Sequence, residues 1–451
     1  MLLATVPLVS CRGSKPSVQN TDPSLAPVQP ASSAALEPLA FVEDDYPKAI
    51  AAAKVSAKPL FVDVWATWCH TCMSMKEFVL PAPEMRALGS AFVWLAIDSE
   101  KAENADFLER FPTTALPTLW IIEPTSERSV LKWVGAATAP ELVTLLEDAV
   151  SATRTDAALG EAGAAAVRGD QASAAGQLEE AATAYREALS KAPARWARRP
   201  RVVEALSQRL RDLERHAECV ELAAREIPGL PPGTPLINVT VNALGAHEAL
   251  AADDPARRHR SLLVREGTRV AEDGTQPVLI DDRSGLFLAL VGALHEADPG
   301  EAKRLARSWA NMLETAAGQA ATSESRAVWD PHRLYAYIEL GEVERALPML
   351  EQSERDFPDD YNPPARLARA YHELRRSEAA LAAATRALHR VHGPRKLRIL
   401  MLKADIHLAD GDRPAARRAI GEALELAGQL RLPANYQRLR QELARRFDEL
   451  G

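Results

Sequence analysis

Hydrophobic residues follow two different periods along the chain, and the change comes near residue 155. Before it, short apolar runs such as Leu60–Trp65 alternate with segments of helical composition, which predicts strands and helices in succession. After it, apolar residues recur every three or four positions, as in the stripe Val203, Leu206, Leu210, Leu213, Ala217 and Val220. The pattern predicts an α/β domain followed by an all-α region.

Small residues recur at regular intervals in the helical region. One segment places Gly169, Gly176, Ala181, Tyr185, Ala188 and Pro193 at the offsets of a tetratricopeptide repeat, in which about 34 residues form two antiparallel helices. Ala346, Ala380 and Ala416 mark later copies, 34 and 36 residues apart. The resemblance implies an all-α solenoid with a first repeat at residues 156–197 and further repeats with a C-terminal cap at residues 327–451. Residues 198–326 are interpreted as degenerate helical repeats. The alternative to a solenoid as a whole is a plain helical bundle.

The segment LFVDVWATWCHTC carries the main candidate chemistry, because it runs from the predicted strand into a helix that begins near Cys69. Unpaired backbone N–H groups and the helix dipole at a helix N-terminus stabilise a thiolate. Cys72 lies one helical turn further on, within reach of the first sulfur. The spacing therefore predicts a reactive Cys69 at the exposed end of the helix and a more buried Cys72 that closes a disulfide with it.

Several motifs in this part of the chain resemble the thioredoxin family. FVDVWATWCHTC matches the family's strand and active-site segment, Ala115-Leu116-Pro117-Thr118 matches its cis-proline loop, and Val134-Gly135-Ala136 precedes a final helix. The resemblance implies a thioredoxin-like α/β domain at residues 40–152, with a mixed sheet and flanking helices. It is similar in particular to membrane-anchored and periplasmic members, including the C-terminal domain of the DsbD electron conductor and related W-C-H-x-C proteins.

The resemblance and the chemistry together assign roles to four residues. Cys69 attacks a substrate disulfide and Cys72 resolves the mixed disulfide. Asp63 is the only ionisable residue in an apolar strand, so we expect burial to raise its pKa and allow it to take the proton from Cys72. Its alternative is a structural carboxylate. Pro117 is expected to be cis, which exposes neighbouring backbone groups to an extended substrate, and its alternative is an ordinary loop proline.

The active-site segment also departs from the family pattern. His70 and Thr71 replace the usual Gly-Pro between the cysteines, and with Trp68 they are expected to modulate the site. Trp94 stands where the family commonly has a lysine beside the buried aspartate. These differences bear on the redox potential, and the context of Asp63 favours a reducing protein over a strong oxidant.

The N-terminus carries a different cysteine. Cys11 ends the apolar string MLLATVPLVSC, which resembles the bacterial lipobox, although no Lys or Arg precedes it. Residues 1–11 are therefore interpreted as a lipoprotein signal with Cys11 as the lipid attachment site. Residues 12–39 are rich in Ser, Pro and Ala and predict a disordered tether. The alternative is a disordered terminus with an incidental cysteine.

Composition excludes several other classes. The chain has 451 residues and a net charge of -8, which disfavours binding to a phosphate backbone, so no nucleic acid partner is expected. A single C-x-x-C is too little for a tetrahedral zinc site, and no phosphate-binding or hydrolase motif is present in the sequence. We therefore expect no metal and no cofactor.

These observations predict a lipid-anchored thiol-disulfide oxidoreductase on the periplasmic side of a bacterial envelope. Arg12 after Cys11 favours the outer membrane, because it is not the aspartate associated with inner-membrane retention. The expected partners are protein thiols or disulfides, a DsbD-like membrane electron donor, a protein or peptide bound by the repeats, and the bilayer through acylated Cys11. The alternative is a non-catalytic scaffold or assembly lipoprotein.

Overall fold

A computed structural model describes residues 37–152, 160–193, 195–276, 278–432 and 436–451. Glu37–Gly451 form one compact unit. The proposed attachment site Cys11 and residues 12–36 of the expected tether lie outside the described residues.

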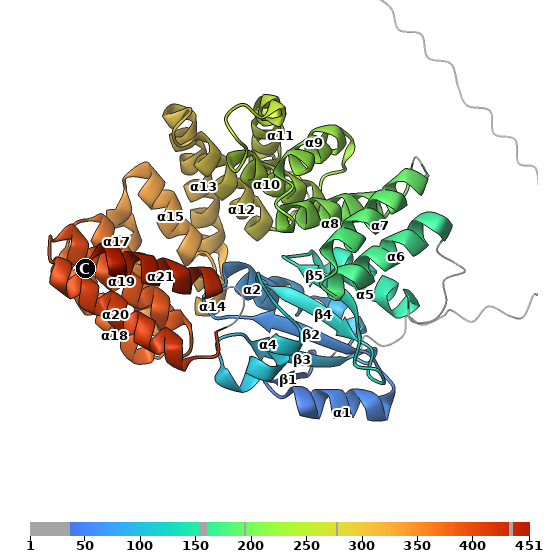
Figure 1. Ribbon diagram of the computed structural model, residues 1–451, viewed down its shortest axis with the longest axis horizontal. Coiled ribbons are helices and arrows are strands. Elements are labelled where there is room, and N and C mark those ends of the chain that lie inside the picture. The colour runs from blue at the N-terminus through green and yellow to red at the C-terminus, as the bar shows by residue number, and fades with distance from the viewer. Residues whose placement is uncertain (1–36, 153–159, 194, 277, 433–435) are drawn as a thin grey trace, which may run out of the picture. The chain divides into compact units, whose positions relative to one another are not determined.

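The first part of this unit contains a five-stranded mixed sheet, drawn in blue to cyan in Figure 1. Its strand order is β1-β3-β2-β4-β5. Strands β1, β3 and β2 are parallel, whereas β4 pairs antiparallel with β2 and with β5. The strands are β1 (Phe41–Glu43), β2 (Leu60–Trp65), β3 (Val93–Asp98), β4 (Thr118–Ile122) and β5 (Ser129–Val134). This mixed sheet confirms the predicted fold class of the domain.

Helices cover both faces of the sheet, and the alternation of side chains along β2 shows why. Leu60, Val62 and Val64 pack with residues of α1 (Tyr46–Ser56) and α4 (Ala105–Arg110). Phe61 points to the other face and packs with Met75 and with α5 (Ala139–Ala152). That second face also carries α2 (His70–Ser74), the π-helical segment η1 (Met75–Val79) and α3 (Pro83–Ala87). Strand β2 thus carries apolar side chains on both of its faces, and helices bury both faces.

The remainder of the described chain is helical, as the 3.6-residue period predicts. Successive helices pack against one another in pairs, such as α6 with α7, α17 with α18 and α19 with α20. The helices are α6 (Gly160–Ala174), α7 (Leu178–Lys191), α8 (Arg199–Asp212), α9 (His216–Glu226), α10 (Thr234–Glu248), α11 (Arg260–Glu272), α12 (Ile280–Leu294), α13 (Pro299–Gln319), α14 (Ser323–Ala327), α15 (Asp330–Leu340), α16 (Ala346–Asp356), α17 (Asn362–Glu373), α18 (Ser377–Arg390), α19 (Arg395–Ala409), α20 (Arg413–Gln429) and α21 (Gln437–Glu449).

The small residues of the repeats lie where two helices approach or where the chain turns between them. A Cβ on Gly169 would come within 2.5 Å of the Tyr185 ring, so only glycine lets α6 and α7 pack this closely. Gly341 ends α15 in the left-handed conformation, with φ at 73°. Glu214 adopts a similar conformation between α8 and α9, with φ at 57°, although the sequence there lacks the repeat signature. Helical pairing therefore continues into residues 198–326.

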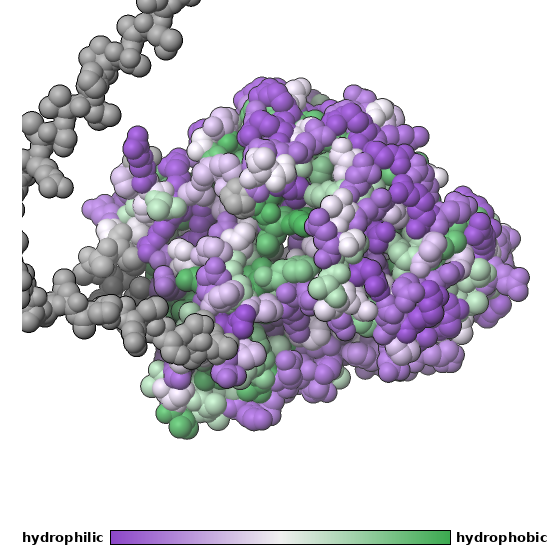
Figure 2. All heavy atoms as spheres, turned by 180° about the vertical axis from the view of Figure 1, so that it is seen from behind, coloured by the Kyte–Doolittle hydropathy of each residue, from purple (hydrophilic) through white to green (hydrophobic). Residues whose placement is uncertain are grey.

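The surface is largely polar. On the face shown in Figure 2, hydrophilic residues cover most of the surface, and hydrophobic residues are visible near its centre and at its lower-left edge. None of the helices in the described ranges has the length and apolar character needed to span a bilayer.

Candidate dithiol active site

Cys69 and Cys72 lie at the junction of β2 and α2, as the sequence predicts. The chain turns after Trp65, and Cys69 caps the N-terminus of α2, with its sulfur accepting a hydrogen bond from the backbone N–H of Cys72 at 3.1 Å. The two residues form a disulfide, with their Cα atoms 5.2 Å apart. The cap places the Cys69 sulfur where backbone N–H groups and the helix dipole favour negative charge.

Asp63 lies in the middle of β2, on the face of the sheet that also carries Phe61 and Met75. It is 1% exposed, and neither carboxylate oxygen has a hydrogen-bond partner among the described residues. Burial raises the pKa of Asp63 to about 6, against the attraction of Lys76, which lowers it. This group can therefore hold or release a proton close to neutral pH.

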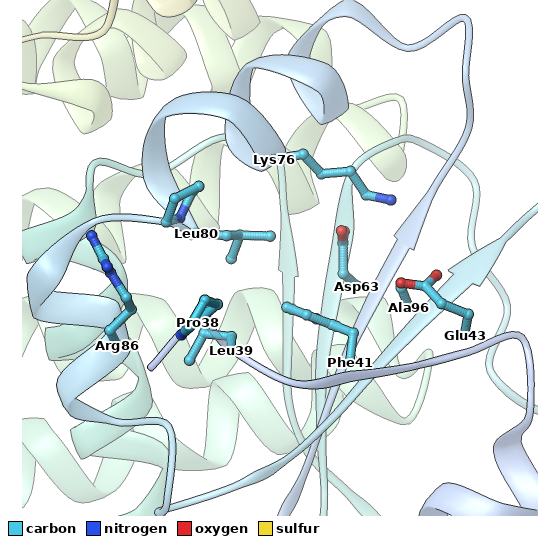
Figure 3. A pocket seen from close by; sticks show the side chains of 10 residues that line it. Pro38, Leu39, Phe41, Glu43, Asp63, Lys76, Leu80, Arg86 and Ala96 are labelled. Atoms are coloured by element: carbon cyan, nitrogen blue, oxygen red, sulfur yellow. The ribbon is translucent and has the colours of Figure 1, made fainter. Parts of the chain in front are cut away.

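The position of Lys76 corrects the expectation that Trp94 replaces the lysine beside Asp63. Trp94 occupies a buried position in β3, but a lysine still lies near Asp63, because Lys76 reaches it from η1 rather than from β3. Figure 3 shows the Lys76 side chain extending toward Asp63. Its ammonium lies 2.9 Å from the centroid of the Trp65 ring. The two side chains border a cavity of about 380 Å³, which Glu43 also lines.

The loop that contains Pro117 reaches the cysteine pair through its neighbour. The Leu116–Pro117 peptide bond is cis, as expected. Leu116 packs against the small buried cluster formed by Ala66, Cys69 and Cys72. Trp68 packs against the same cluster, so the sequence-predicted residues Cys69, Cys72, Trp68 and the Pro117 loop come together at one place.

The dithiol is buried, contrary to the expectation of an exposed Cys69. Cys69 is 5% exposed and Cys72 is 1% exposed. The reason is that residues of the helical region lie over the site. The His70 imidazole donates through Nδ1 to the carbonyl oxygen of Val328 at 2.6 Å, and its Nε2 lies 2.5 Å from Oδ1 of Asp281 in α12.

The contact between His70 and Asp281 is buried on both sides. Nδ1 of His70 carries a proton because it faces a carbonyl oxygen, which only accepts, and Nε2 faces the Asp281 carboxylate. Burial alone would raise the pKa of Asp281, but the charge and hydrogen bond of His70 outweigh it and lower that pKa, with help from Thr71. Asp281 is therefore the charged member of this buried contact, and its carboxylate faces the His70 ring.

A second histidine extends this network. The His332 ring centroid lies 3.9 Å from that of His70, and its Nδ1 lies 2.6 Å from the Ser284 hydroxyl. Ser284 also accepts a hydrogen bond from Nε1 of Trp309 at 2.6 Å, so its own proton goes to His332. Burial, reinforced by the charge of His70, holds the pKa of His332 well below its usual range, and the ring is neutral.

Sequence reasoning missed Asp281, Ser284 and His332. They lie more than 200 residues beyond Cys69; Asp281 and Ser284 fall in the stretch 198–326, where no repeat signature is present, and His332 falls just after it. The sequence contains one signal, which is the acidic pair Asp281-Asp282 at the start of an apolar helical segment. In the structure both side chains are buried. A buried carboxylate in a structural helix calls for a partner.

Other contacts join the two parts near Trp68. The Glu100 carboxylate accepts hydrogen bonds from Nε1 of Trp68 at 3.1 Å, from the backbone N–H of Arg395 at 2.8 Å and from the Tyr436 hydroxyl at 2.9 Å. The Arg395 guanidinium lies 4.5 Å from the centroid of the Trp68 ring. These bonds hold Arg395 at the start of α19, and Tyr436, against the active-site turn.

Metal ligands are not grouped at this site. In the part of the chain that the structure describes, no set of three or more His, Cys, Asp or Glu side chains is arranged to hold a metal ion.

Comparison with known proteins defines the class of the first part of the chain. Residues 41–124 match the family model described as thioredoxin-like. The chain thus combines a thioredoxin-like domain with a region of paired helices.

The curated relatives are proteins named thiol:disulfide interchange protein DsbD. The relative from Pseudoalteromonas atlantica (strain T6c / ATCC BAA-1087) is 33% identical over 78 residues, and that from Cronobacter sakazakii (strain ATCC BAA-894) is 35% identical over 78 residues. Each alignment covers 17% of this chain and 13% of the relative, so the similarity is confined to one domain.

Two of the solved structures that align with the chain are tetratricopeptide repeat proteins. A tetratricopeptide repeat protein from Parabacteroides merdae covers 64% of this chain and 98% of its own, at 11% identity and a TM-score of 0.43. The TPR2AB domain of yeast Sti1, solved in complex with pHSP90, covers the same shares at 14% identity and a TM-score of 0.25.

Proposed function

We propose that this protein is a thiol-disulfide oxidoreductase that uses Cys69 and Cys72. The observation that carries the proposal is the disulfide at the N-terminus of α2, next to a strand whose buried Asp63 has a pKa of about 6. A helix cap favours the Cys69 thiolate, and a buried carboxylate can act as the base for a second thiol.

The proposed reaction consists of two successive thiol-disulfide exchanges. In the reduced protein, the Cys69 thiolate attacks one sulfur of a substrate disulfide, and the first substrate thiolate leaves and takes a proton. Asp63 then accepts the proton of Cys72, whose thiolate attacks the Cys69 sulfur of the mixed disulfide and releases the second substrate thiol. The substrate gains two electrons and the protein becomes the disulfide. A dithiol reductant, such as a DsbD-like membrane electron donor, restores the reduced form.

A reducing role is part of the proposal. A cation beside a thiolate stabilises the reduced form and makes a dithiol protein more oxidising. His70 follows Cys69 directly, but its ring faces the carboxylate of Asp281 at 2.5 Å, and this negative charge offsets the effect of a protonated ring on the Cys69 thiolate. This pairing supports a moderate reductant rather than a strong oxidant.

The decisive experiment is single-turnover oxidation of the reduced protein by bis(2-hydroxyethyl) disulfide, followed by mass spectrometry. Cys69→Ser should abolish the reaction, and Cys72→Ser should accumulate the mixed disulfide because the resolving thiol is missing. Cys219→Ser is the matched control, since this free thiol is buried in α9 and burial raises its pKa to about 12. Full resolution of the mixed disulfide by Cys72→Ser would contradict the proposal.

The burial of Cys69 also supports the alternative, in which the protein is a non-catalytic scaffold. If the thioredoxin-like domain only supports the helical region, its cysteines serve the packing of β2 and α2. The reduced protein should then fail to react with the small disulfide, and Cys69→Ser should change its stability alone.

Location and partners complete the proposal. We propose that lipid on Cys11 anchors the protein on the periplasmic side of a bacterial membrane, where its helical surface binds a protein or peptide. Expression of the chain with its native start in a bacterial host should yield protein in the membrane fraction, and Cys11→Ala should release it or leave it unprocessed. Cys219→Ala is the control, and unlipidated wild-type protein in the soluble fraction would contradict the anchor.

A further inference from the structure

A cavity of about 560 Å³ reaches the dithiol from the side of the helical region. The thioredoxin-like domain contributes Trp68, Cys69, His70, Thr71 and Leu116 to its wall, and the opposite wall comes from α15, α17, α19 and the residues beside them. Cys69 is otherwise buried, so this cavity is the approach to its sulfur among the described residues.

The charges around this cavity have one sign. Arg366, Arg369, Arg395 and Arg398 line it, and none of the described lining residues is acidic. The chain as a whole carries a net charge of -8, so the cavity is a local exception. A concave site lined with like charges concentrates ligands of the opposite sign.

Three of these guanidinium groups have no carboxylate partner. Arg369 forms an ion pair with Glu373 at 2.7 Å. The side chains of Arg366, Arg395 and Arg398, by contrast, make no hydrogen bond or ion pair within the described ranges. Arg395 lies over the ring of Trp68, whereas Arg398 lies 5.9 Å from the centroid of Tyr436.

Carboxylates act on these arginines only from a distance. Asp330 and Asp360 attract Arg366, yet burial dominates and lowers its pKa. Glu100 attracts Arg395 but is already hydrogen-bonded by Trp68 and Tyr436. Guanidinium groups without partners in a confined site form strong, often bidentate, bonds with carboxylates.

The size of the cavity limits what can enter. Pockets for small molecules enclose about 300 to 1,000 Å³, and this cavity falls within that range. A disulfide on the surface of a folded protein would first have to displace α15 and α17. The geometry therefore suits a substrate of low molecular weight.

We infer that the substrate is a small disulfide that carries carboxylate groups. The inference rests on the proposed oxidoreductase function and names its substrate class. Arg366 and Arg398 hold the carboxylates, and the Cys69 thiolate attacks the disulfide between them. One substrate thiol leaves at each exchange, and the substrate takes up the two electrons of the dithiol.

Three disulfides of similar size and different charge test this inference. They are 3,3′-dithiodipropionate, which is anionic, bis(2-hydroxyethyl) disulfide, which is neutral, and cystamine, which is cationic. The oxidation rate of the reduced protein is measured with each, and each rate is divided by the rate with dithiothreitol to remove the intrinsic reactivity of the disulfide. The normalised rate should be about tenfold higher for the anionic than for the neutral disulfide, and lowest for cystamine.

The preference should depend on the cavity arginines. The double variant Arg366→Gln, Arg398→Gln should bring the anionic-to-neutral ratio close to one. Arg440→Gln, which removes an exposed arginine of α21 that does not line the cavity, should keep the ratio. Added salt should lower the ratio in the wild type.

Each outcome has a distinct meaning. Equal normalised rates for all three disulfides, a preference for cystamine, or faster reduction of insulin than of dithiodipropionate would overturn the inference while leaving the oxidoreductase function intact. Failure to react with any disulfide would refute the function itself.

Discussion

Replacing Asp63 with asparagine is expected to stabilise the fold and slow the chemistry. Burial raises the pKa of Asp63 from an ordinary 3.8 to about 6. The folded protein therefore keeps this proton to a higher pH than the unfolded chain, and stability falls as the pH rises from 3.8 to about 6. A difference of about two pH units corresponds to about 3 kcal/mol, all of it lost above the folded pKa.

Asparagine imitates the protonated carboxyl group, which is neutral and similar in shape. Asp63→Asn should therefore raise the free energy of unfolding by about 3 kcal/mol near pH 8 and by almost nothing near pH 4. Urea unfolding of both proteins across this range measures the difference. Other buried acids, such as Glu204 and Asp282, titrate in both proteins and cancel.

The same change should slow resolution of the mixed disulfide, because Cys72 loses its base. A positioned base contributes about a hundredfold or more. In the wild type, the rate of resolution should rise through about pH 6, and the variant should lack this rise. Lys76→Met is the companion variant: it removes the charge that favours ionised Asp63, so the rise should move to higher pH.

A stability gain that is equal near pH 4 and near pH 8 would refute the reasoning, because it could not come from the titration of Asp63. So would a wild-type rate of resolution that is independent of pH in this range.

Other predictions follow from buried contacts. Asp281→Asn breaks a buried ion pair and should lower the free energy of unfolding by about 3 kcal/mol or more. Asp282→Asn should lower it by less than about 1 kcal/mol, because burial raises the pKa of Asp282 to about 8 and this side chain is already neutral. In the reduced protein, Asp281→Asn should also speed alkylation of Cys69 by iodoacetamide, and equal rates in the two variants would contradict the covering role of α12. Gly169→Ala should lower the free energy of unfolding, measured in urea, by about 1 to 3 kcal/mol, because the new methyl group forces the Tyr185 ring aside. An unchanged urea midpoint would contradict the close packing of α6 against α7.

The sequence by itself determined the features that depend on nearby residues. The apolar run Leu60–Trp65 predicted a strand, and the segment that follows predicted a helix that begins near Cys69. The spacing of Ala346, Ala380 and Ala416 predicted helical pairs, and all three residues are fully buried. An apolar strand and a helix start depend on residues a few positions apart, and repeat packing depends on helices that are neighbours in the sequence, so all three can be predicted from local pattern.

Only the tertiary structure decided how the site is covered. The contact of His70 with Asp281 joins residues that no local pattern connects, and it buries a cysteine that the helix position alone would leave exposed. The lysine near Asp63 comes from η1 rather than β3 for the same reason: proximity in space depends on how elements pack, not on their place in a motif. The arginines of the Cys69 cavity lie on α17 and α19, about 300 residues beyond the cysteine, and only the packing of those helices near the active-site turn brings their charge to the sulfur.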